Sequence, residues 1–419
     1  MHHFEYREDT LFAENVSVTE IAAQVGTPFY VYSQATLERH FKVFEEAFEG
    51  TNRLVCYSAK ANTSLAILAL LKKLGAGLDI VSGGELYRGL QAGFAPQKIV
   101  YSGVGKRIDE IDEAISAGIL MFNIESLQEL ELVDARAGAV NKKAPVALRV
   151  NPDVDPQTHP YISTGLKKNK FGVDVASALE GYKAAQKMKN IKVVGVDCHI
   201  GSQITKITPF KDALDSVLRL TAEIRALGID LSYLDMGGGL GITYDDEVPP
   251  QPRDYAQALA AVGKESGLTL ILEPGRLIVG NAGLLVTKVL FRKTGQAKEF
   301  IIVDAGMNDL LRPTLYQAFH AIKPVLRGKS ESITADVVGP ICESGDFLAQ
   351  DRRLPAVAKD DLLAVFSAGA YGFNMSSNYC SRPRVAEVMV SGDRFEVIRM
   401  RQNYADLMTG ETVPGFIDK

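Results

Sequence analysis

Short apolar runs recur along the first two thirds of the chain, separated by stretches in which apolar residues return at helical spacing. Eight runs have the length and composition of β-strands: residues 54–57, 77–81, 98–102, 120–124, 146–150, 192–199, 233–236 and 269–273. Helical patterning lies between them, for example at residues 64–74, 84–92, 108–117, 126–137 and 209–227. Strands that alternate with helices predict βα units. Eight units in about 220 residues fit a closed (β/α)8 TIM-like barrel, with a doubly wound open sheet as the alternative.

The rhythm changes after residue 276. Runs at residues 284–291, 300–304, 332–338, 362–366, 385–390 and 395–400 have strand composition without regular helices between them. This pattern indicates a mostly β C-terminal domain, and the strand-like run at residues 28–32 is expected to join it. The predicted domains are therefore an N-terminal segment, residues 1–34, that contributes a strand to the β domain; the barrel, residues 35–280; and the β domain, residues 281–419.

Composition narrows the class of protein. At 419 residues the chain is too long for one core, and its 46% hydrophobic and 23% charged residues are typical of a soluble enzyme. The net charge of −5 argues against nucleic acid or an anionic membrane as partner, so a small-molecule substrate is expected. The sequence has neither an export signal nor a run of 18 apolar residues, and we expect a cytoplasmic protein.

The four cysteines, Cys56, Cys198, Cys342 and Cys380, include no CxxC pair. They are expected to be reduced thiols and to form neither a disulfide frame nor a zinc site. Histidines and carboxylates do not recur at metal-site spacing either, so no metal is expected. This disfavours a metal-dependent barrel hydrolase.

Lys60 follows directly on the first predicted strand of the barrel, in the run Tyr57-Ser58-Ala59-Lys60-Ala61-Asn62. A lysine at the C-terminal end of a barrel strand points into the mouth of the barrel, where its amine can attack a carbonyl. The alternative is a surface lysine in a loop, which is the commoner place for this residue type.

Other strand ends carry groups that complement this lysine. They are His199-Ile200-Gly201-Ser202-Gln203, Gly237-Gly238-Gly239-Leu240-Gly241 and Glu273-Pro274-Gly275-Arg276. An imidazole can stack on a ring, glycine N–H groups can cradle a phosphate, and a carboxylate can bind a pyridine nitrogen. The combination predicts a site for pyridoxal 5′-phosphate.

These motifs resemble the fold-type III decarboxylases that use pyridoxal phosphate and share the alanine racemase-like fold. The likeness is closest to the members that act on diaminopimelate. It extends over nearly the whole chain and includes Gly77-Leu78-Asp79-Ile80-Val81-Ser82-Gly83-Gly84-Glu85 and Cys342-Glu343-Ser344-Gly345-Asp346. The glycine run alone would be weak evidence, since such loops also serve tight turns.

The resemblance implies roles for the barrel residues. Lys60 would hold the cofactor through a Schiff base, and His199 would stack on its ring unless it merely ends a core strand. Glu273 would keep the proton on the pyridine nitrogen, where alanine racemases carry an arginine. The phosphate would lie against the segment Glu273-Pro274-Gly275-Arg276, Ser202 and the N–H groups of Gly238, Gly239 and Gly241. Asp79 and Arg149 are expected to pair, in either a structural or a catalytic role.

The resemblance also implies the substrate contacts. Arg276, Arg312 and Tyr316 would hold the distal carboxylate of the substrate, and Glu343 its distal ammonium. Tyr371 would contact both cofactor and substrate unless it is a core tyrosine. Cys342 would return a proton to the α-carbon after CO2 leaves, whereas Cys56, Cys198 and Cys380 are expected to be buried structural thiols.

The implied reaction is the conversion of meso-2,6-diaminopimelate to L-lysine and CO2, the last step of lysine biosynthesis. The alternatives are a sister enzyme such as a carboxynorspermidine decarboxylase or a non-catalytic protein that binds pyridoxal phosphate. An ornithine or arginine decarboxylase needs an acidic distal pocket, which Arg312 argues against. The resemblance further implies a homodimer with shared active sites, in which Cys342 and Glu343 reach the barrel of the neighbouring chain.

Overall fold

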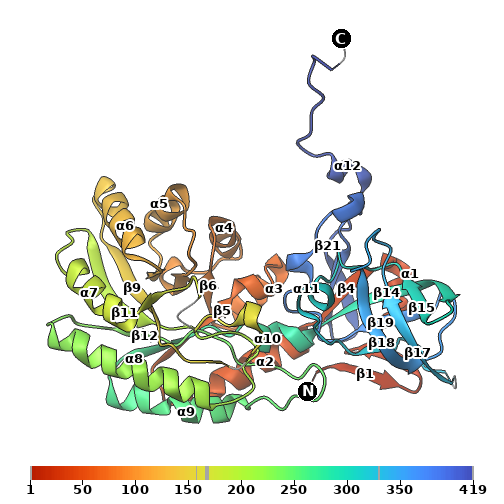
Figure 1. The fold of residues 1–419 in the computed structure, drawn as a ribbon, viewed down its shortest axis with the longest axis horizontal. Helices are drawn as coiled ribbons and strands as arrows, with labels where there is room; N and C mark the ends of the chain where they lie inside the picture. The colour runs from red at the N-terminus through yellow and green to blue at the C-terminus, as the bar shows by residue number, and fades with distance from the viewer. Residues whose placement is uncertain (1, 157, 166–168, 329–330, 418–419) are drawn as a thin grey trace. The chain divides into compact units, whose positions relative to one another are not determined.

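The structure is a computed structural model that describes residues 2–156, 158–165, 169–328 and 331–417. The chain forms two compact units (Figure 1). One consists of residues 37–280, and the other of residues 1–36 together with residues 281–419.

Residues 37–280 form the predicted barrel of parallel strands. The ring runs β5, β6, β7, β8, β9, β11, β12, β13, and β13 pairs back with β5. The doubly wound alternative is therefore wrong, because the sheet closes on itself. The strands are β5 Arg53–Ser58, β6 Gly77–Ile80, β7 Ile99–Tyr101, β8 Met121–Ile124, β9 Ala144–Asn151, β11 Ile191–Asp197, β12 Tyr233–Asp235 and β13 Thr269–Leu272, with the short β10, Val173–Asp174, beside β9.

Helices surround these strands on the outside (Figure 1). They are α2 Gln34–Ala47, α3 Leu65–Lys73, α4 Gly83–Gln91, α5 Ile108–Ala117, α6 Leu127–Ala139, α7 Val175–Ala185, α8 Thr208–Ala226 and α9 Pro252–Glu265, and the short α10, Arg276–Val279, follows β13. Because helices cover one face and the barrel interior covers the other, strands such as β6 and β8 are buried along their whole length.

The interior of the barrel is built in two layers. Residues of a strand alternate between the two faces, so every second residue points inward. One interior layer is apolar and contains Cys56, Val100, Met121, Ala147, Val194 and Ile271, each from a different strand. Two residues further along five of these strands the side chains are polar and buried: Ser58, Ser102, Asn123, Arg149 and Glu273. This polar layer lies at the C-terminal ends of the strands, where barrel enzymes build their active sites.

The second unit is mostly β. Its main sheet has the order β18, β17, β15, β14, β4, β20, β21, with β19 on β14 and β16 on β19. The strands are β4 Phe29–Ser33, β14 Gly283–Thr294, β15 Glu299–Val303, β16 Ile322–Pro324, β17 Ser332–Val338, β18 Phe347–Pro355, β19 Leu362–Val365, β20 Ala386–Ser391 and β21 Arg394–Arg399. The N-terminal strand β4 lies between β14 and β20.

Alternating residues of β4, such as Phe29 and Val31, pack in one core with Leu284 and Val286 of β14. The same core takes in side chains of a small sheet and of a helix near the N-terminus: β1 Phe4–Arg7, β2 Thr10–Ala13, β3 Val16–Ser17 and α1 Val18–Val25. This packing explains why an N-terminal segment that precedes the barrel folds with the C-terminal sheet.

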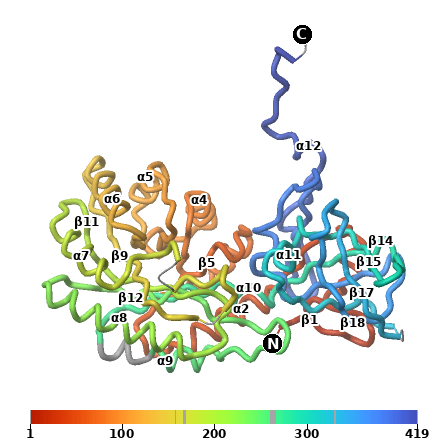
Figure 2. The backbone as a smooth tube through the Cα atoms, in the orientation of Figure 1, coloured from red at the N-terminus to blue at the C-terminus, as the bar shows by residue number. Residues whose placement is uncertain are grey.

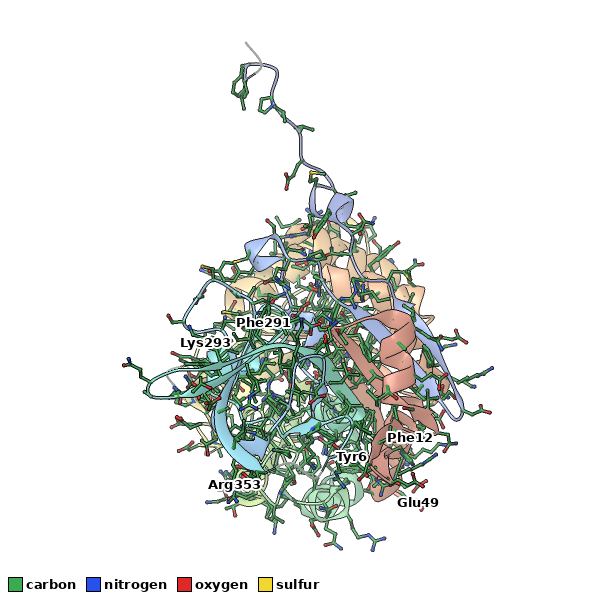
Figure 3. All side chains as sticks on the ribbon, turned by 90° about the vertical axis from the view of Figure 1, so that its right-hand side faces the viewer. Tyr6, Phe12, Glu49, Phe291, Lys293 and Arg353 are labelled. Atoms are coloured by element: carbon green, nitrogen blue, oxygen red, sulfur yellow. The ribbon has the colours of Figure 1, made fainter. Side chains whose placement is uncertain are left out.

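The sequence pattern does not predict β16 or β18. Strand β18 lies at the edge of its sheet and carries exposed polar residues such as Arg353, so its alternation is weak. Figure 3 labels Arg353 together with Phe291 and Lys293 from the exposed end of β14.

After β21 the chain forms α12, Tyr404–Leu407, and the backbone then extends away from the sheet of its own unit (Figure 2). Across the part of the chain that the structure describes, no helix has the length and apolar character needed to cross a membrane. The mostly β character predicted for this unit is confirmed.

Candidate active site

The Lys60 side chain lies at the C-terminal end of β5, as predicted. It belongs to a single turn, Ala59–Ala61, that directly follows the strand. Its amine donates hydrogen bonds to Ser58 Oγ and Asp79 Oδ2, both at 2.6 Å, and Ser58 also donates to Asp79 at 2.6 Å. Asp79 is fully buried, whereas about a third of the Lys60 side chain is exposed. The amine is thus held by two hydrogen bonds, while part of the Lys60 side chain is exposed.

The expected pair of Asp79 and Arg149 is wrong. Asp79 pairs with Lys60, whereas Arg149 forms a buried ion pair with Glu125 at 2.8 Å. The guanidinium of Arg149 also lies 4.8 Å from the centre of the Phe171 ring. Asp79 and Arg149 both lie in barrel strands, as predicted. The carboxylate that pairs with Arg149 is that of Glu125, which follows the neighbouring strand β8.

Glu85 is a further acidic group near Lys60. It lies in the first turn of α4, which begins after the N-cap Ser82, and it accepts a hydrogen bond from the Val81 N–H at 2.8 Å. Burial raises the pKa of Glu85 to about 7, although the Val81 N–H and the positive charge of Lys60 act in the opposite direction.

His199 follows β11, and its neutral form is stabilised by its surroundings. Its Nδ1 accepts a hydrogen bond from the Gly238 N–H at 3.2 Å, which places the ring proton on Nε2. Burial, with Arg149 and Lys60 nearby, lowers the pKa of His199 well below its usual value. A neutral imidazole is suited to stacking on an aromatic ring.

The glycines after β12 are required by close packing. Gly237 has φ +62°, and a Cβ there would lie 2.6 Å from His199 Nδ1. A Cβ on Gly238 would lie 2.1 Å from the carbonyl oxygen of Glu273. Any larger residue would therefore push apart the ends of β11, β12 and β13.

Some of the predicted phosphate donors already have a hydrogen-bond acceptor within the protein, and others do not. The N–H groups of Gly238 and Gly241 already donate to His199 and to the Ile204 carbonyl. Within the described ranges, no residue accepts a hydrogen bond from the N–H of Gly239 or Gly275. These two groups are the ones that can donate to a phosphate without breaking a contact. The roles of Gly238, Gly241 and Pro274 stay predictions.

Ser202 and Arg276 lie together, as the sequence motifs suggested. Arg276 Nη2 donates to Ser202 Oγ at 2.9 Å, and Nη1 donates to the Tyr244 hydroxyl at 2.7 Å. Arg276 is 6% exposed, so its charge is buried beside Ser202 and Tyr244. Tyr244 was not identified from the sequence.

Glu273 offers an oxygen that fits a pyridine nitrogen. The residue is 5% exposed, and its Oε1 has no hydrogen-bond partner among the residues that the structure describes. Burial, together with the charge of Asp235, raises the pKa of Glu273 well above its usual value. A buried carboxyl oxygen without a donor, next to free N–H groups and a lysine amine, fits pyridoxal 5′-phosphate.

In the second unit, the segments that carry the predicted substrate residues Arg312, Tyr316 and Glu343 contact each other. The short helix α11, Arg312–Tyr316, and the loop of residues 341–346 are joined by Thr314, whose hydroxyl donates to the Gly345 carbonyl at 2.6 Å. Asp346 fixes this loop, since its carboxylate accepts the N–H groups of Ile341 and Met307, each at 2.6 Å.

Arg312 is buried and oriented by a histidine that the sequence motifs did not reveal. Its Nη1 lies 2.9 Å from His320 Nε2, and His320 Nδ1 lies 2.8 Å from the Phe366 carbonyl. The carbonyl can only accept, so Nδ1 carries the proton and Nε2 accepts from Arg312. Tyr316 and Tyr371 are both partly exposed, and Tyr371 has a φ of +55°.

Glu343 and Cys342 are exposed on this loop. The Tyr379 hydroxyl donates to Glu343 Oε2 at 2.7 Å, a contact that no motif of the chain predicts. Cys56 and Cys198 are buried, as predicted, but Cys380 is exposed. The expectation of a buried Cys380 is wrong because its single turn, Tyr379–Ser381, contains no buried residue.

The described residues include no group of three or more His, Cys, Asp or Glu side chains arranged to hold a metal ion. The ionisable groups at the barrel mouth are instead grouped around Lys60, Glu273 and Arg149. Such an arrangement suits an organic cofactor that is held by a lysine.

Comparison with known proteins agrees with this geometry. A family model described as the pyridoxal-binding domain of pyridoxal-dependent decarboxylases matches residues 34–280. The barrel and the mostly β second unit have the fold of the fold-type III decarboxylases.

Full-length relatives narrow the class further. The diaminopimelate decarboxylase of Aquifex aeolicus is 51% identical over 403 residues, covering 96% of each chain. The crystal structure of the Helicobacter pylori diaminopimelate decarboxylase complexed with L-lysine is 44% identical, with a TM-score of 0.90, and covers 93% of this chain and 98% of that one. The M. jannaschii enzyme in co-complex with L-lysine is 40% identical, with a TM-score of 0.94, and covers 99% of this chain and 100% of that one. The chain belongs to the diaminopimelate decarboxylase family.

Proposed function

We propose that this chain converts meso-2,6-diaminopimelate to L-lysine and CO2 with pyridoxal 5′-phosphate as cofactor. The observation that carries this proposal is the position of the Lys60 amine, fixed by Ser58 and Asp79 at the barrel mouth. The full-length likeness to diaminopimelate decarboxylases supports the same activity.

The cofactor supplies, when bound, an electron sink for the electron pair left on the α-carbon as CO2 departs. Lys60 would hold it covalently through its amine, and Glu273 would keep the proton on its pyridine nitrogen. The N–H groups of Gly239 and Gly275, together with Ser202 and Arg276, would bind the phosphate. The neutral His199 ring would pack against the cofactor. Cys342 would deliver the proton that the α-carbon needs after decarboxylation.

Substrate choice would depend on the cluster in the second unit. Diaminopimelate carries an amino-acid group at each end, so its distal end needs both a cation and an anion. Arg312 and Tyr316 would bind the distal carboxylate and Glu343 the distal ammonium, with Arg276 and Tyr371 as further contacts. The buried, oriented guanidinium of Arg312 supports this choice over a substrate whose distal end is only positive.

The direct test is CO2 release measured on one enzyme preparation with a panel of substrates. The panel should hold the diaminopimelate isomers, carboxynorspermidine, ornithine and arginine. We expect meso-diaminopimelate to give the highest kcat/KM. A preference for carboxynorspermidine would favour the sister activity, and no CO2 release from any amino acid would favour a non-catalytic pyridoxal phosphate protein.

We further propose a homodimer in which Cys342 and Glu343 complete the site of the neighbouring chain. In a dimer with two-fold symmetry both active sites form together, because the contact between the two chains that completes one site also occurs at the other. We also place the enzyme in the cytoplasm, which four free cysteines, two of them exposed, support.

A further inference from the structure

Three neighbouring strands of the barrel end in buried carboxyl groups. Asp197 ends β11, Asp235 ends β12 and Glu273 follows β13, with exposures of 1%, 0% and 5%. Arg149 acts on Asp197 and Lys60 acts on Glu273, but these cations already have carboxylate partners at hydrogen-bond distance, namely Glu125 and Asp79. The barrel therefore holds more buried acids than nearby cations can neutralise.

Buried carboxyl groups this close together cannot all be ionised. Burial, followed by the charge of Asp197, raises the pKa of Asp235 to about 8, although two hydrogen-bond donors favour its charged form. Asp235 in turn has the largest electrostatic effect on Glu273, and a side-chain hydrogen bond between the two carboxyl groups also raises the pKa of Glu273. The two residues lie at the ends of the paired strands β12 and β13. Two carboxyl groups in one buried site favour a state that binds at least one proton.

The structure fixes Asp235 firmly in this position. Its Oδ1 accepts the N–H of Gly237 at 2.8 Å, and its Oδ2 accepts the side-chain amide of Asn123 at 3.2 Å. Asn123 belongs to β8 on another side of the ring, and its amide also donates to Ser102 at 3.1 Å. Asp235 is thus the central member of a polar network that crosses the barrel from Ser102 through Asn123 to Gly237.

We infer that Asp235 is a positioning residue that, in its protonated form, donates a hydrogen bond to Glu273 and leaves the second Glu273 oxygen free for the pyridine nitrogen. The pair then carries one negative charge, which matches the one positive charge of a protonated pyridine ring. The inference rests on the proposed function through the role of Glu273 alone.

Other titratable groups act on this pair or feel its charge, and they must be considered in any pH experiment. Besides Asp197 they are Asp79, Lys60, Arg149, Cys56, Cys198 and Tyr255. Asp197 acts on Glu273 through charge alone, and it is equally buried and ends the strand next to β12. Asp197→Asn is therefore a matched control for the loss of one acid from the layer.

The test is the dissociation constant of pyridoxal phosphate for the cofactor-free protein, measured by tyrosine fluorescence. Asp235→Asn keeps a neutral donor toward Glu273, and we expect binding within about threefold of the native protein. Asp235→Ala removes the donor, and we expect binding to weaken by roughly tenfold or more, the scale of one hydrogen bond to a charged group. Asp197→Asn should resemble Asp235→Asn.

Thermal unfolding of the same cofactor-free proteins separates this role from a merely structural one. A carboxyl group with a raised pKa holds its proton in the folded state after the unfolded chain has lost it, so stability falls as pH rises from about 4 to about 8. The melting temperature of Asp235→Asn, compared with that of the native protein at the same pH, should therefore increase as pH rises from about 4 to about 8.

Several outcomes would overturn the inference. Equal loss of binding in Asp235→Asn and Asp235→Ala would mean that the charge of Asp235 is needed, and tight binding by both variants would mean that Asp235 does not position Glu273. If the variants do not fold, an infrared spectrum of the native protein that lacks a protonated carboxyl band near neutral pH would also reject it. If the native protein fails to bind pyridoxal phosphate at all, the proposed function itself is wrong.

Discussion

His320 holds the guanidinium of Arg312 in a buried contact, with 2.9 Å between His320 Nε2 and Arg312 Nη1. The histidine is fully buried, and its other nitrogen is fixed by the Phe366 carbonyl at 2.8 Å. A guanidinium has five N–H donors in one plane, so its orientation decides which of them can reach a carboxylate. The residue that orients Arg312 should therefore influence substrate choice.

We expect His320→Ala to raise the KM for diaminopimelate roughly tenfold, about 1.4 kcal/mol, with a smaller effect on kcat. His320→Gln is the matched control, because an amide can accept from Arg312 and donate to the Phe366 carbonyl. Steady-state CO2 release checks both variants. A kcat loss without a KM change would place Arg312 outside the distal binding pocket.

Lys60 is the counterion of Asp79 and, in the proposed function, the attachment point of the cofactor. Lys60→Ala should abolish turnover and the visible absorbance of a lysine-bound cofactor. It also leaves Asp79 buried without its cation, and because the lysine is partly exposed we expect a loss of about 1–2 kcal/mol in stability. Lys60→Arg keeps the positive charge without a nucleophilic amine, so it should be inactive but more stable than Lys60→Ala. Turnover near the native level in either variant would remove Lys60 from the mechanism.

Glu85 should make the protein less stable as pH rises. Its folded pKa of about 7 exceeds its ordinary value of 4.5, so between these values the folded chain binds more protons than the unfolded chain. The corresponding stability is present below about pH 4.5 and is lost as pH rises toward 7. Glu85→Gln removes this pH dependence. Near pH 8 its free energy of unfolding, measured with urea, should exceed that of the native protein by up to about 3 kcal/mol.

Glu110 supplies a control of opposite sign for this prediction. Backbone N–H groups of Arg107 and Gly83 bind its carboxylate, and its pKa is lowered. Its contribution is present at neutral pH and is lost on acidification, so Glu110→Gln should lower stability at neutral pH and have little effect in acid. Identical pH profiles for the two variants would contradict both assignments.

The sequence was sufficient for the barrel because its signals are local. Lys60 lies two residues after the strand end Tyr57-Ser58, and the alternation within a strand places Glu273 two residues after the apolar Ile271. The partners of these residues were harder to predict, since they come from other strands. Asp79 was expected beside Arg149, but the register of the closed ring places it beside Lys60.

Contacts between segments distant in sequence were also not predicted in the second unit. His320 and Tyr379 carry no motif, and each is recognised only by its contact with Arg312 or Glu343. Strand β18 was missed because edge strands tolerate polar residues on both faces. Cys380 was expected to be buried by analogy with other free cysteines, but burial depends on packing around its turn, which sequence does not reveal.

The shared-site dimer makes a prediction that does not depend on knowing the interface. If Lys60 of one chain works with Cys342 of the other, Lys60→Ala and Cys342→Ala should each be inactive alone. A mixed dimer has one site with both defects and one site with neither. With random mixing at equal amounts about half of the dimers are mixed, so roughly a quarter of all sites should be intact.

Co-refolding the two variants and measuring CO2 release tests this prediction, with differently tagged chains to show that mixed dimers form. Each variant refolded alone, and a mixture of the separately refolded dimers, serve as controls. Recovery of about a quarter of native activity would support a site built from two chains. Activity that stays at the level of the single variants, although mixed dimers are present, would mean that Lys60 and Cys342 act within one chain or that Cys342 has no part in the reaction.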